Sequence, residues 1–525
     1  MRKLTIHRTA DLIIQRSHTA IESIENIKAS FSHYILTFAF AITLRYFVES
    51  LSTHEEMSLI GFVHYLLFYA ALALSLILLF HLATKTAMTK VAKVILPGFL
   101  VLIMAPSLDL LISGGKGIPM SYLLPGVHDD LLWRFLNFFG DLRSMGDSPP
   151  MGITPGIKIE IAVVLLSSFV YFLAKTSRLA KSLGHTFLTY SVVFAFFVTP
   201  FVVRAMAESL GLASEFSHEL FANYFATIAL LLGVVITYLG DKRHFVSIAK
   251  DIRLLRVIYY VSMFVLGVTI GASNATFELS ATNMFHFLFI PLALIFAWLF
   301  SIMTNNITDY EIDKISNPDR PLVNASLSLD VYRKLAWSFL SLAMFYAAIA
   351  SFTALLFITL FIGNYFLYSM PPLRLKRIPF FSKLAISLNS LALVILGFLT
   401  ITHSLHNFPG IAFVIFLIGV TASANVIDIK DYDGDKHAGI KTLPVVLGLT
   451  RAKRVIGLFF LLNYSGLFFV TTFLNAPLYW FFAFALFGIV QFLLINKKNY
   501  DERPVLLLTL LTIWLITYMI KQLTV

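Results

Sequence analysis

The sequence contains no cysteine and few charged residues. Of its 525 residues, 13% are Asp, Glu, Lys or Arg, whereas 58% are hydrophobic. The lack of cysteine excludes disulfides, zinc–thiolate sites, iron–sulfur clusters and thiol catalysis. The shortage of charge, with a mean hydropathy of +0.82, excludes an ordinary soluble globule and requires many membrane-spanning segments. The sequence therefore predicts an all-α, polytopic membrane protein.

Apolar runs of about 17–25 residues predict about fifteen transmembrane helices. The positive-inside rule supports this count, because Lys and Arg gather in alternate loops when the N-terminus lies in the cytoplasm. The net charge of +11 then reflects cytoplasmic loops, and we expect no nucleic-acid partner. The expected spans are residues 32–49, 58–83, 91–113, 157–174, 185–206, 219–240, 257–274, 283–303, 331–349, 352–370, 384–402, 410–427, 455–473, 477–495 and 504–522.

A basic stretch, "GDKRHFVSIAKDIRLLR", suggests a division of the chain. We expect a cytoplasmic amphipathic segment at 1–30, a six-span membrane domain of unknown role at 31–240, a basic linker at 241–256 and a nine-span domain at 257–525. Residues 1–30 lack the apolar core of a signal peptide, and the absence of a transit peptide favours a prokaryotic cytoplasmic membrane. Arg45 and Arg204 lie near span ends, where snorkelling to the interface is expected.

Two clusters of carboxylates follow apolar spans on the side expected to be cytoplasmic. Asn305, Asp309 and Asp313 are spaced i, i+4, i+8 and would share one helix face. In the second cluster Asp428, Asp431 and Asp435 fall on one face, whereas Asp433 points away. A solvated acidic loop would explain either cluster alone, but two such clusters at span ends on one side favour a shared function.

The composition of the clusters predicts the ligand. Facing acidic helix ends repel each other unless they share divalent cations, and hard oxygen ligands without His or Cys favour Mg²⁺. Mg²⁺ keeps coordination positions for phosphate oxygens. The residues therefore indicate a diphosphate bridged to the protein through Mg²⁺.

Three ordered motifs resemble those of the UbiA-type intramembrane prenyltransferases. "NNITDYEIDKISNPDRPLVN" (305–324) is similar to the first signature of that family, and "DIKDYDGDKHAGIKTLP" (428–444) to the second. "YSMPPLRLKR" (368–377) resembles the basic loop after the fourth span. The resemblance covers about 280 residues from roughly 245 onward. It implies a nine-helix bundle around a central cavity, which matches the nine spans expected after the linker.

The resemblance also implies roles for individual residues. Asn305, Asp309 and Asp313 would hold one Mg²⁺, Asp431 and Asp435 a second, and Asp428 would support the second signature. An isoprenyl diphosphate would place its head between the clusters and its tail in the cavity. The candidate diphosphate-binding residues are Arg320, Tyr368, Arg374, Lys376, Arg377 and Lys441. For the basic residues, an anchor at the membrane edge is an equally good interpretation, and Arg320 could pair with Asp319 instead.

The leading hypothesis is a Mg²⁺-dependent prenyltransferase with its active site facing the cytoplasm. Its acceptor would be an aromatic quinone precursor, a glycerol-phosphate lipid or a phosphosugar, and its partners would be this acceptor, the donor and membrane lipid. A polytopic transporter, or a protein that binds phosphorylated isoprenoid lipids without turnover, is the alternative. A transporter predicts carboxylates near mid-span, whereas these clusters lie at span ends.

Overall fold

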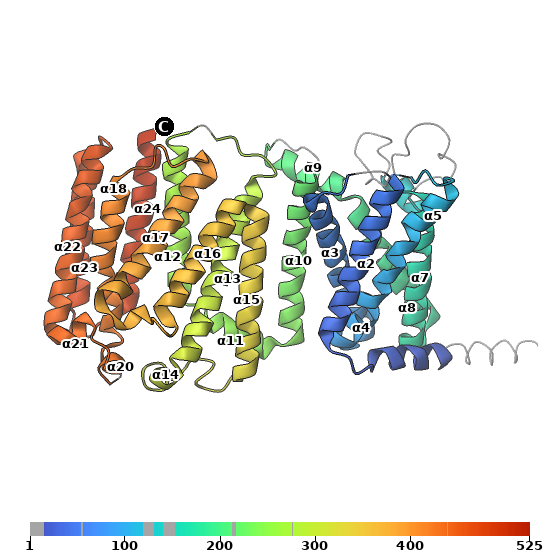
Figure 1. Cartoon of the computed structure of the whole chain (residues 1–525), viewed down its shortest axis with the longest axis horizontal. Coiled ribbons are helices and arrows are strands. Elements are labelled where there is room, and N and C mark those ends of the chain that lie inside the picture. The colour runs from blue at the N-terminus through green and yellow to red at the C-terminus, as the bar shows by residue number, and fades with distance from the viewer. Residues whose placement is uncertain are drawn as a thin grey trace, which may run out of the picture. The chain divides into compact units, whose positions relative to one another are not determined.

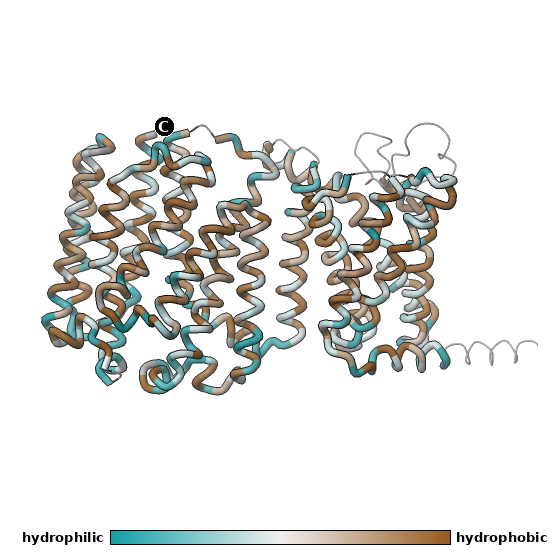
Figure 2. Tube along the Cα trace, in the orientation of Figure 1, coloured by the Kyte–Doolittle hydropathy of each residue, from teal (hydrophilic) through white to brown (hydrophobic). Residues whose placement is uncertain are grey.

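The computed structural model describes residues 15–53, 56–118, 131–139, 153–212, 217–275, 277–437 and 439–524. Every extended regular element in this part of the chain is a helix (Figure 1). Hydrophobic residues run along most of the helix lengths, and hydrophilic residues gather toward helix ends and loops (Figure 2). The prediction of an all-α, polytopic membrane protein is confirmed.

The number of spans is close to the expected fifteen. Within the described residues, thirteen helices are long and apolar enough to cross a membrane. The pair α8 (Leu179–Phe197) and α9 (Thr199–Ser209), bent by 58°, makes up to fourteen. The expected span 331–349 forms helix α15 (Leu329–Ala350), but Asp330, Arg333 and Lys334 make its first two turns polar. Each expected span thus corresponds to helical structure, and α15 is not among the thirteen helices that are apolar enough to cross a membrane.

The chain divides into two compact units. Unit 1 comprises Met1–Lys242 with Ser280–Thr282, and unit 2 comprises Arg243–Leu279 with Asn283–Val525. The basic segment expected to be a linker contains helix α11 (Lys242–Asp251). Of the expected amphipathic segment, residues 15–25 are helical, and residues 1–14 lie outside the described part of the chain. The functional division proposed from the sequence stays a prediction.

Unit 1 is a bundle of helices, three of which begin at a polar cap. The side chains of Ser58, Thr154 and Ser217 accept a hydrogen bond from a backbone N–H of the helix that follows each of them. Besides α8 and α9, the unit contains α2 (Phe31–Thr53), α3 (Leu59–Thr84), α4 (Met88–Gly98), η1 (Phe99–Ile103), α5 (Met104–Ile112), α6 (Leu131–Leu136), α7 (Pro155–Thr176) and α10 (His218–Gly240).

One span of unit 1 is broken, and a buried arginine compensates for the break. Pro106 has no N–H, so the carbonyl of Leu102, four residues earlier, lacks its normal helical donor. Arg45 on α2 supplies one, because its Nη1 donates to this oxygen over 2.6 Å. The N–H of Ala105 in turn donates to Glu160 Oε2 over 3.2 Å. In a bilayer such backbone groups need partners from the protein itself.

The expectation that Arg45 snorkels to the interface is wrong. Arg45 is 1% exposed, and its guanidinium pairs with Glu49 over 2.8 Å and with Glu160 over 3.1 Å. Glu160 lies on α7 and is far away in sequence, so the position of Arg45 within its span could not reveal this partner. Arg204 is exposed and pairs with Glu208 on its own helix over 2.8 Å.

Unit 2 contains the remaining helices. Besides α15 and most of α11 these are α12 (Leu254–Ala272), α13 (Met284–Thr308), α14 (Tyr310–Ser316), α16 (Phe352–Ser369), η2 (Leu375–Arg377), α17 (Pro379–Thr402), α18 (Ile411–Val414), η3 (Ile415–Val420), α19 (Thr421–Ser423), η4 (Ala424–Ile429), α20 (Tyr432–His437), α21 (Leu443–Leu447), α22 (Leu449–Phe473), α23 (Leu478–Asn496) and α24 (Glu502–Thr524). The short helices α14, α20 and α21 lie at one end of this unit (Figure 1).

Helices α12 and α17 of unit 2 pack with their backbones in close approach. A Cβ atom on Gly267 would come within 2.0 Å of the Val394 carbonyl oxygen, and one on Gly397 within 2.1 Å of the Phe264 oxygen. Small residues allow such contacts between membrane helices, where packing rather than the hydrophobic effect drives association. This contact fixes two helices that both line the cavity described below.

Two arginine–glutamate pairs of unit 1 test how burial changes the contribution of an ion pair to stability. Both join Nε to a carboxylate four residues later over 2.8 Å, but the Arg45 side chain is 2% exposed and that of Arg204 is 50% exposed. Arg45→Leu should lower the free energy of unfolding by about 3–5 kcal/mol, because Glu49 and Glu160 lose their buried counter-charge. Arg204→Leu should cost less than about 1 kcal/mol.

Unfolding of both variants in detergent micelles measures this difference. Equal, small effects of the two substitutions would contradict the assignment of Arg45 as a structural ion-pair centre in unit 1.

Candidate active site

The two carboxylate clusters are brought together at one end of unit 2. Helix α13 ends at Thr308, Asp309 follows as its C-cap, and α14 then carries Asp313. The second cluster begins in the 3₁₀ segment η4 and continues into α20. Helix α14 packs against α20, although more than 100 residues separate them in sequence. The clusters therefore face a common space.

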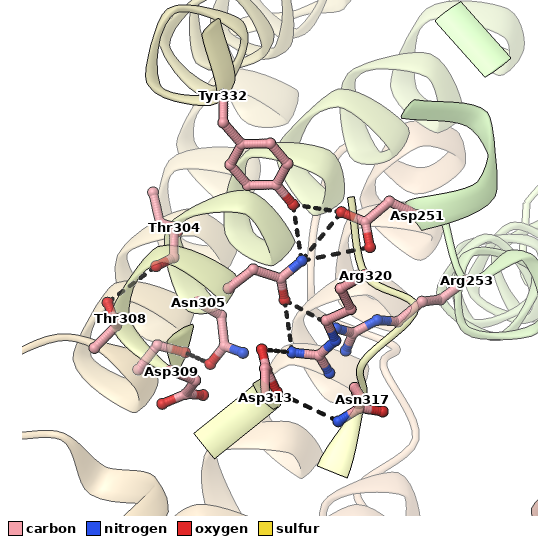
Figure 3. A network of polar contacts seen from close by, with 12 residues as sticks. Asp251, Arg253, Thr304, Asn305, Thr308, Asp309, Asp313, Asn317, Arg320 and Tyr332 are labelled. Atoms are coloured by element: carbon pink, nitrogen blue, oxygen red, sulfur yellow. Dashed lines mark hydrogen bonds and ion pairs between the residues drawn. The ribbon is translucent and has the colours of Figure 1, made fainter. Parts of the chain in front are cut away.

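Basic side chains engage the carboxylates of the first cluster. Asp309 accepts a hydrogen bond from Arg374 Nη2 over 2.7 Å and also pairs with Lys376. Asp313 pairs with Arg320, which reaches it from the loop after α14 (Figure 3). Burial raises the pKa of Asp313 despite the opposing effect of this arginine. The first cluster is thus neutralised by the protein itself.

Asn305 lies beside Lys376 and links the first cluster to the basic loop that follows α16. Its Oδ1 accepts from Ser369 Oγ over 2.9 Å and from Lys376 Nζ over 3.1 Å. Burial lowers the pKa of Lys376, against the opposing effect of Asp309. Lys376 therefore sits between an amide oxygen and a carboxylate, in a position from which a phosphate oxygen could replace either of them.

The second cluster carries more negative charge than the protein neutralises nearby. Asp428 pairs with the buried Lys383 through Oδ1, whereas its Oδ2 is buried without a partner. Asp431 makes no hydrogen bond through its side chain and no ion pair with any described residue. Burial, together with Asp428 and Asp431, raises the pKa of Asp435 to about 7. Asp433 is exposed and points away, as the helical spacing predicted.

The clusters stand at the end of a cavity of about 890 Å³ inside unit 2. Side chains along all of α12 line it, from Arg253 to Asn274 just beyond the helix, a distance of roughly 30 Å at 1.5 Å per residue. Away from the carboxylates the lining is mainly apolar and includes Met263, Leu266 and Phe460. The site thus joins a charged end to a long apolar channel.

The structure gathers most, but not all, of the residues singled out in the sequence. The cavity is lined by Asn305, Asp309, Asp313, Arg320, Tyr368, Lys376, Asp428, Asp431 and Asp435. Arg374 contacts the cluster without lining the cavity. Arg377 and Lys441 are exposed and lie outside the lining. Arg320 bonds to Asp313 and Asn306 rather than to Asp319.

A buried hydrogen-bond centre beside the first cluster was missed in the sequence. Asn306 is 1% exposed, and its Nδ2 donates to Asp251 over 3.0 Å and to Tyr332 over 2.8 Å. Its Oδ1 accepts from Arg253 over 3.1 Å and from Arg320 over 3.0 Å. Figure 3 shows these partners converging from α11, α15 and the loop after α14. Asn306 thereby orients the arginine that holds Asp313.

Lys383 is a second residue that sequence reasoning missed. It is 2% exposed and lines the cavity beside Asp428. The signal was present, because a lysine within the apolar run "PFFSKLAISL" is expensive in a membrane unless it has a partner. Its partner, 45 residues later, becomes identifiable once the helices are placed.

The donor set fits a divalent cation that is shared with a ligand. Among the described residues no group of three or more His, Cys, Asp or Glu side chains is arranged to hold a metal by itself. The orphaned Asp428 Oδ2 and the unpaired Asp431 are hard oxygen donors that Mg²⁺ would satisfy, with phosphate oxygens and water completing its coordination. The residues present therefore fit Mg²⁺ bound together with a diphosphate.

Comparison with known proteins identifies relatives of unit 2. The profile of the UbiA prenyltransferase family matches residues 261–516. A digeranylgeranylglyceryl phosphate synthase of Thermococcus sibiricus is 30% identical over 39% of this chain and 70% of its own length. A 2-acyl-4-prenylphloroglucinol 6-prenyltransferase of Humulus lupulus is 31% identical over 38% of this chain and 52% of its own. The chain spans about half the length of several other curated relatives.

A solved structure is also similar. The structure of a UbiA homolog from Archaeoglobus fulgidus bound to GPP and Mg²⁺ has a TM-score of 0.41 and 18% sequence identity. The match covers 53% of this chain and 98% of that chain.

The buried network around Asn306 predicts the effect of removing its amide. Asn306→Leu should lower the free energy of unfolding by about 3 kcal/mol, because Asp251, Tyr332 and two arginines each lose a buried partner. Asn324→Leu is the control, since Asn324 makes its two hydrogen bonds at an exposed position, and should change stability by less than about 1 kcal/mol. Thermal unfolding of both variants in detergent measures these changes in stability. If Asn306→Leu is as stable as the unmodified chain, the network adds no net stability.

Proposed function

The chain belongs to the UbiA prenyltransferase family, and we propose that it transfers an isoprenyl group from a polyprenyl diphosphate to an acceptor in the plane of the membrane. The observation that carries this proposal is the convergence of two carboxylate clusters on the end of one long, mainly apolar cavity. The charged end suits a diphosphate head with Mg²⁺, and the apolar channel suits the isoprenyl tail.

The charge balance of the site supports a bound diphosphate. Five cations line the charged end of the cavity: Arg253, Arg256, Arg320, Lys376 and Lys383. Five carboxylates line the same end: Asp309, Asp313, Asp428, Asp431 and Asp435. Two Mg²⁺ ions would add four positive charges and a diphosphate three negative ones. The protein groups have no net charge on their own, and the filled site would have a net charge of about +1. Surroundings of low dielectric constant favour such a small net charge.

Each part of the site has a role in the transfer. When bound, Mg²⁺ supplies electrostatic stabilisation of the charge that develops on the departing diphosphate. Lys376 and Arg320, now held by Asp309 and Asp313, exchange these carboxylates for diphosphate oxygens. The allylic C–O bond breaks, its electron pair leaves with the diphosphate, and the acceptor bonds to the allylic carbon and releases a proton. The apolar lining keeps water from the allylic cation.

We propose a phosphate-bearing lipid as the first acceptor to test. Arg253 and Arg256 line the same charged end from the start of α12, and Arg256 meets its carboxylate partner Glu502 at 3.8 Å, beyond hydrogen-bonding distance. These arginines suit a glyceryl phosphate head, and the synthase relatives are named for such a product. An aromatic acceptor, suggested by the Humulus lupulus relative, is the second choice. Orientation toward the cytoplasm stays a prediction from the loop charges.

Isosteric replacement of one carboxylate in each cluster tests the transfer. Asp309→Asn and Asp431→Asn should each reduce the rate of diphosphate release by at least about 10²–10³-fold, because each removes a fixed charge that stabilises the transition state. Asp433→Asn is the matched control, since Asp433 lies on the same short helix as Asp435 but is exposed. It should keep nearly full activity.

Diphosphate release from geranylgeranyl diphosphate, with purified protein, Mg²⁺ and a panel of lipid phosphate and phenolic acceptors, is the measurement. Release that requires both an acceptor and Mg²⁺, and that fails in both cluster variants, supports the proposal. Tight Mg²⁺-dependent donor binding without turnover with any acceptor would favour a binding protein instead.

A further inference from the structure

Unit 1 contains a second cavity that the prenyl transfer does not use. It has a volume of about 190 Å³ and lies among α2, α3, α4, η1, α7 and α8. Its lining along α7 runs from Ile157 to Tyr171, roughly 21 Å of helix. Every residue that lines it belongs to unit 1, so it is separate from the site in unit 2.

One part of this cavity is polar and is lined by one guanidinium and one carboxyl group. Arg45 and Glu160 both line it, and Glu49 lies directly behind them. Two carboxylates thus accompany one guanidinium, and that guanidinium already donates to both carboxylates and to the Leu102 carbonyl. An anionic head group would meet no excess of positive charge there and would be repelled.

Two buried residues of the lining carry hydroxyl groups that make no hydrogen bond with any described residue. Tyr69 on α3 is 5% exposed, and its hydroxyl makes no hydrogen bond with any described residue. Ser168 on α7 is likewise 5% exposed and makes no side-chain hydrogen bond with a described residue. Hydroxyl groups of buried residues are normally paired. Both line the cavity, where a bound molecule would pair with them.

The remaining lining residues and the cavity volume favour a small ligand that is mainly apolar. This part of the lining consists mainly of aliphatic and aromatic side chains, among them Phe68, Leu72, Val164 and Phe197. An apolar protein cavity of about 150 Å³ holds a benzene ring. A cavity of 190 Å³ therefore takes a molecule somewhat larger than benzene and much smaller than a two-chain lipid.

We propose that unit 1 binds an uncharged hydroxyl compound with an apolar body of about ten carbons, in the cavity between Tyr69 and Ser168. The ligand hydroxyl donates to Glu160 or Ser168 and accepts from Tyr69, and its hydrocarbon fills the space beside Phe68 and Leu72. This chemistry belongs to short isoprenyl alcohols and to single-ring phenols. The site excludes diphosphates and carboxylates, which distinguishes it from the site in unit 2.

Binding of two probes with equal numbers of heavy atoms tests this proposal. Tritiated geraniol, an isoprenyl alcohol, and tritiated thymol, a phenol, are each titrated onto the full chain in nanodiscs. Excess geranyl diphosphate with Mg²⁺ is present, so that the cavity of unit 2 is occupied if the proposed function is correct. Geranate, with the same carbon chain as geraniol and a carboxylate head, is the anionic comparison.

Two tyrosine variants locate the binding. Tyr69→Phe removes a single hydroxyl and should weaken binding about fivefold, the effect of one net hydrogen bond. Tyr34→Phe is the matched control, because Tyr34 is a buried tyrosine of unit 1 whose hydroxyl has no partner among the described residues and which lies outside the cavity lining. It should leave binding unchanged. Because the effect of Tyr69→Phe is confined to unit 1, this comparison holds even if the proposed transferase activity fails.

Saturable binding of either probe, weakened by Tyr69→Phe, unchanged by Tyr34→Phe and at least tenfold tighter than that of geranate, supports the site. The preferred probe then identifies the source of the ligand as an alcohol or a phenol. The proposal is overturned if neither probe binds saturably, if Tyr69→Phe binds as well as the unmodified chain, or if geranate binds equally well.

Discussion

Carboxylates held at a membrane edge need compensating positive charge, and this requirement shapes both units. In unit 2 the first cluster is compensated by Arg374, Lys376 and Arg320. In the second cluster, Asp428 Oδ2 and the Asp431 carboxylate have no partner among the described residues. In unit 1 a single guanidinium compensates two glutamates. The difference matters for function, because the unpaired oxygens create a demand that a divalent cation and its ligand can meet.

In unit 2, different elements form the channel and carry its charged end. Helices α12 and α17 approach so closely that glycine is required at Gly267 and Gly397, and they form part of the wall of a channel about as long as a helix that spans a bilayer. The π-helical segment η3 precedes the 3₁₀ segment η4, in which the second cluster begins. Rigid helices thus hold the channel, and short helices and loops carry the charged end.

The sequence predicted those features that depend on local spacing. Asn305, Asp309 and Asp313 repeat every four residues after an apolar run, so their common face could be read directly. The resemblance of the motifs to the prenyltransferase family is confirmed by the family match and by a relative that the chain covers over 70% of its length. The all-helical fold followed from hydropathy alone.

The features that were missed depend on contacts between residues far apart in sequence. Arg45 was expected to snorkel because its span position was known but its partner Glu160, 115 residues later, was not. Lys383 and Asp428 are 45 residues apart, and Asn306 is connected to Asp251 and Tyr332 on two other helices. A single sequence shows that such polar groups need partners, but it does not show which partners they find.

We propose that the two carboxylate clusters act together through a divalent cation on one diphosphate. This proposal is tested most directly by measuring the affinity of the purified chain for a non-ionisable thio analogue of geranylgeranyl diphosphate, with Mg²⁺ and with a chelator. The chelator should weaken binding about 100-fold, roughly 2.7 kcal/mol, and Asp309→Asn and Asp431→Asn should each remove most of the Mg²⁺ effect. Equal affinity with Mg²⁺ and with chelator would contradict the proposal.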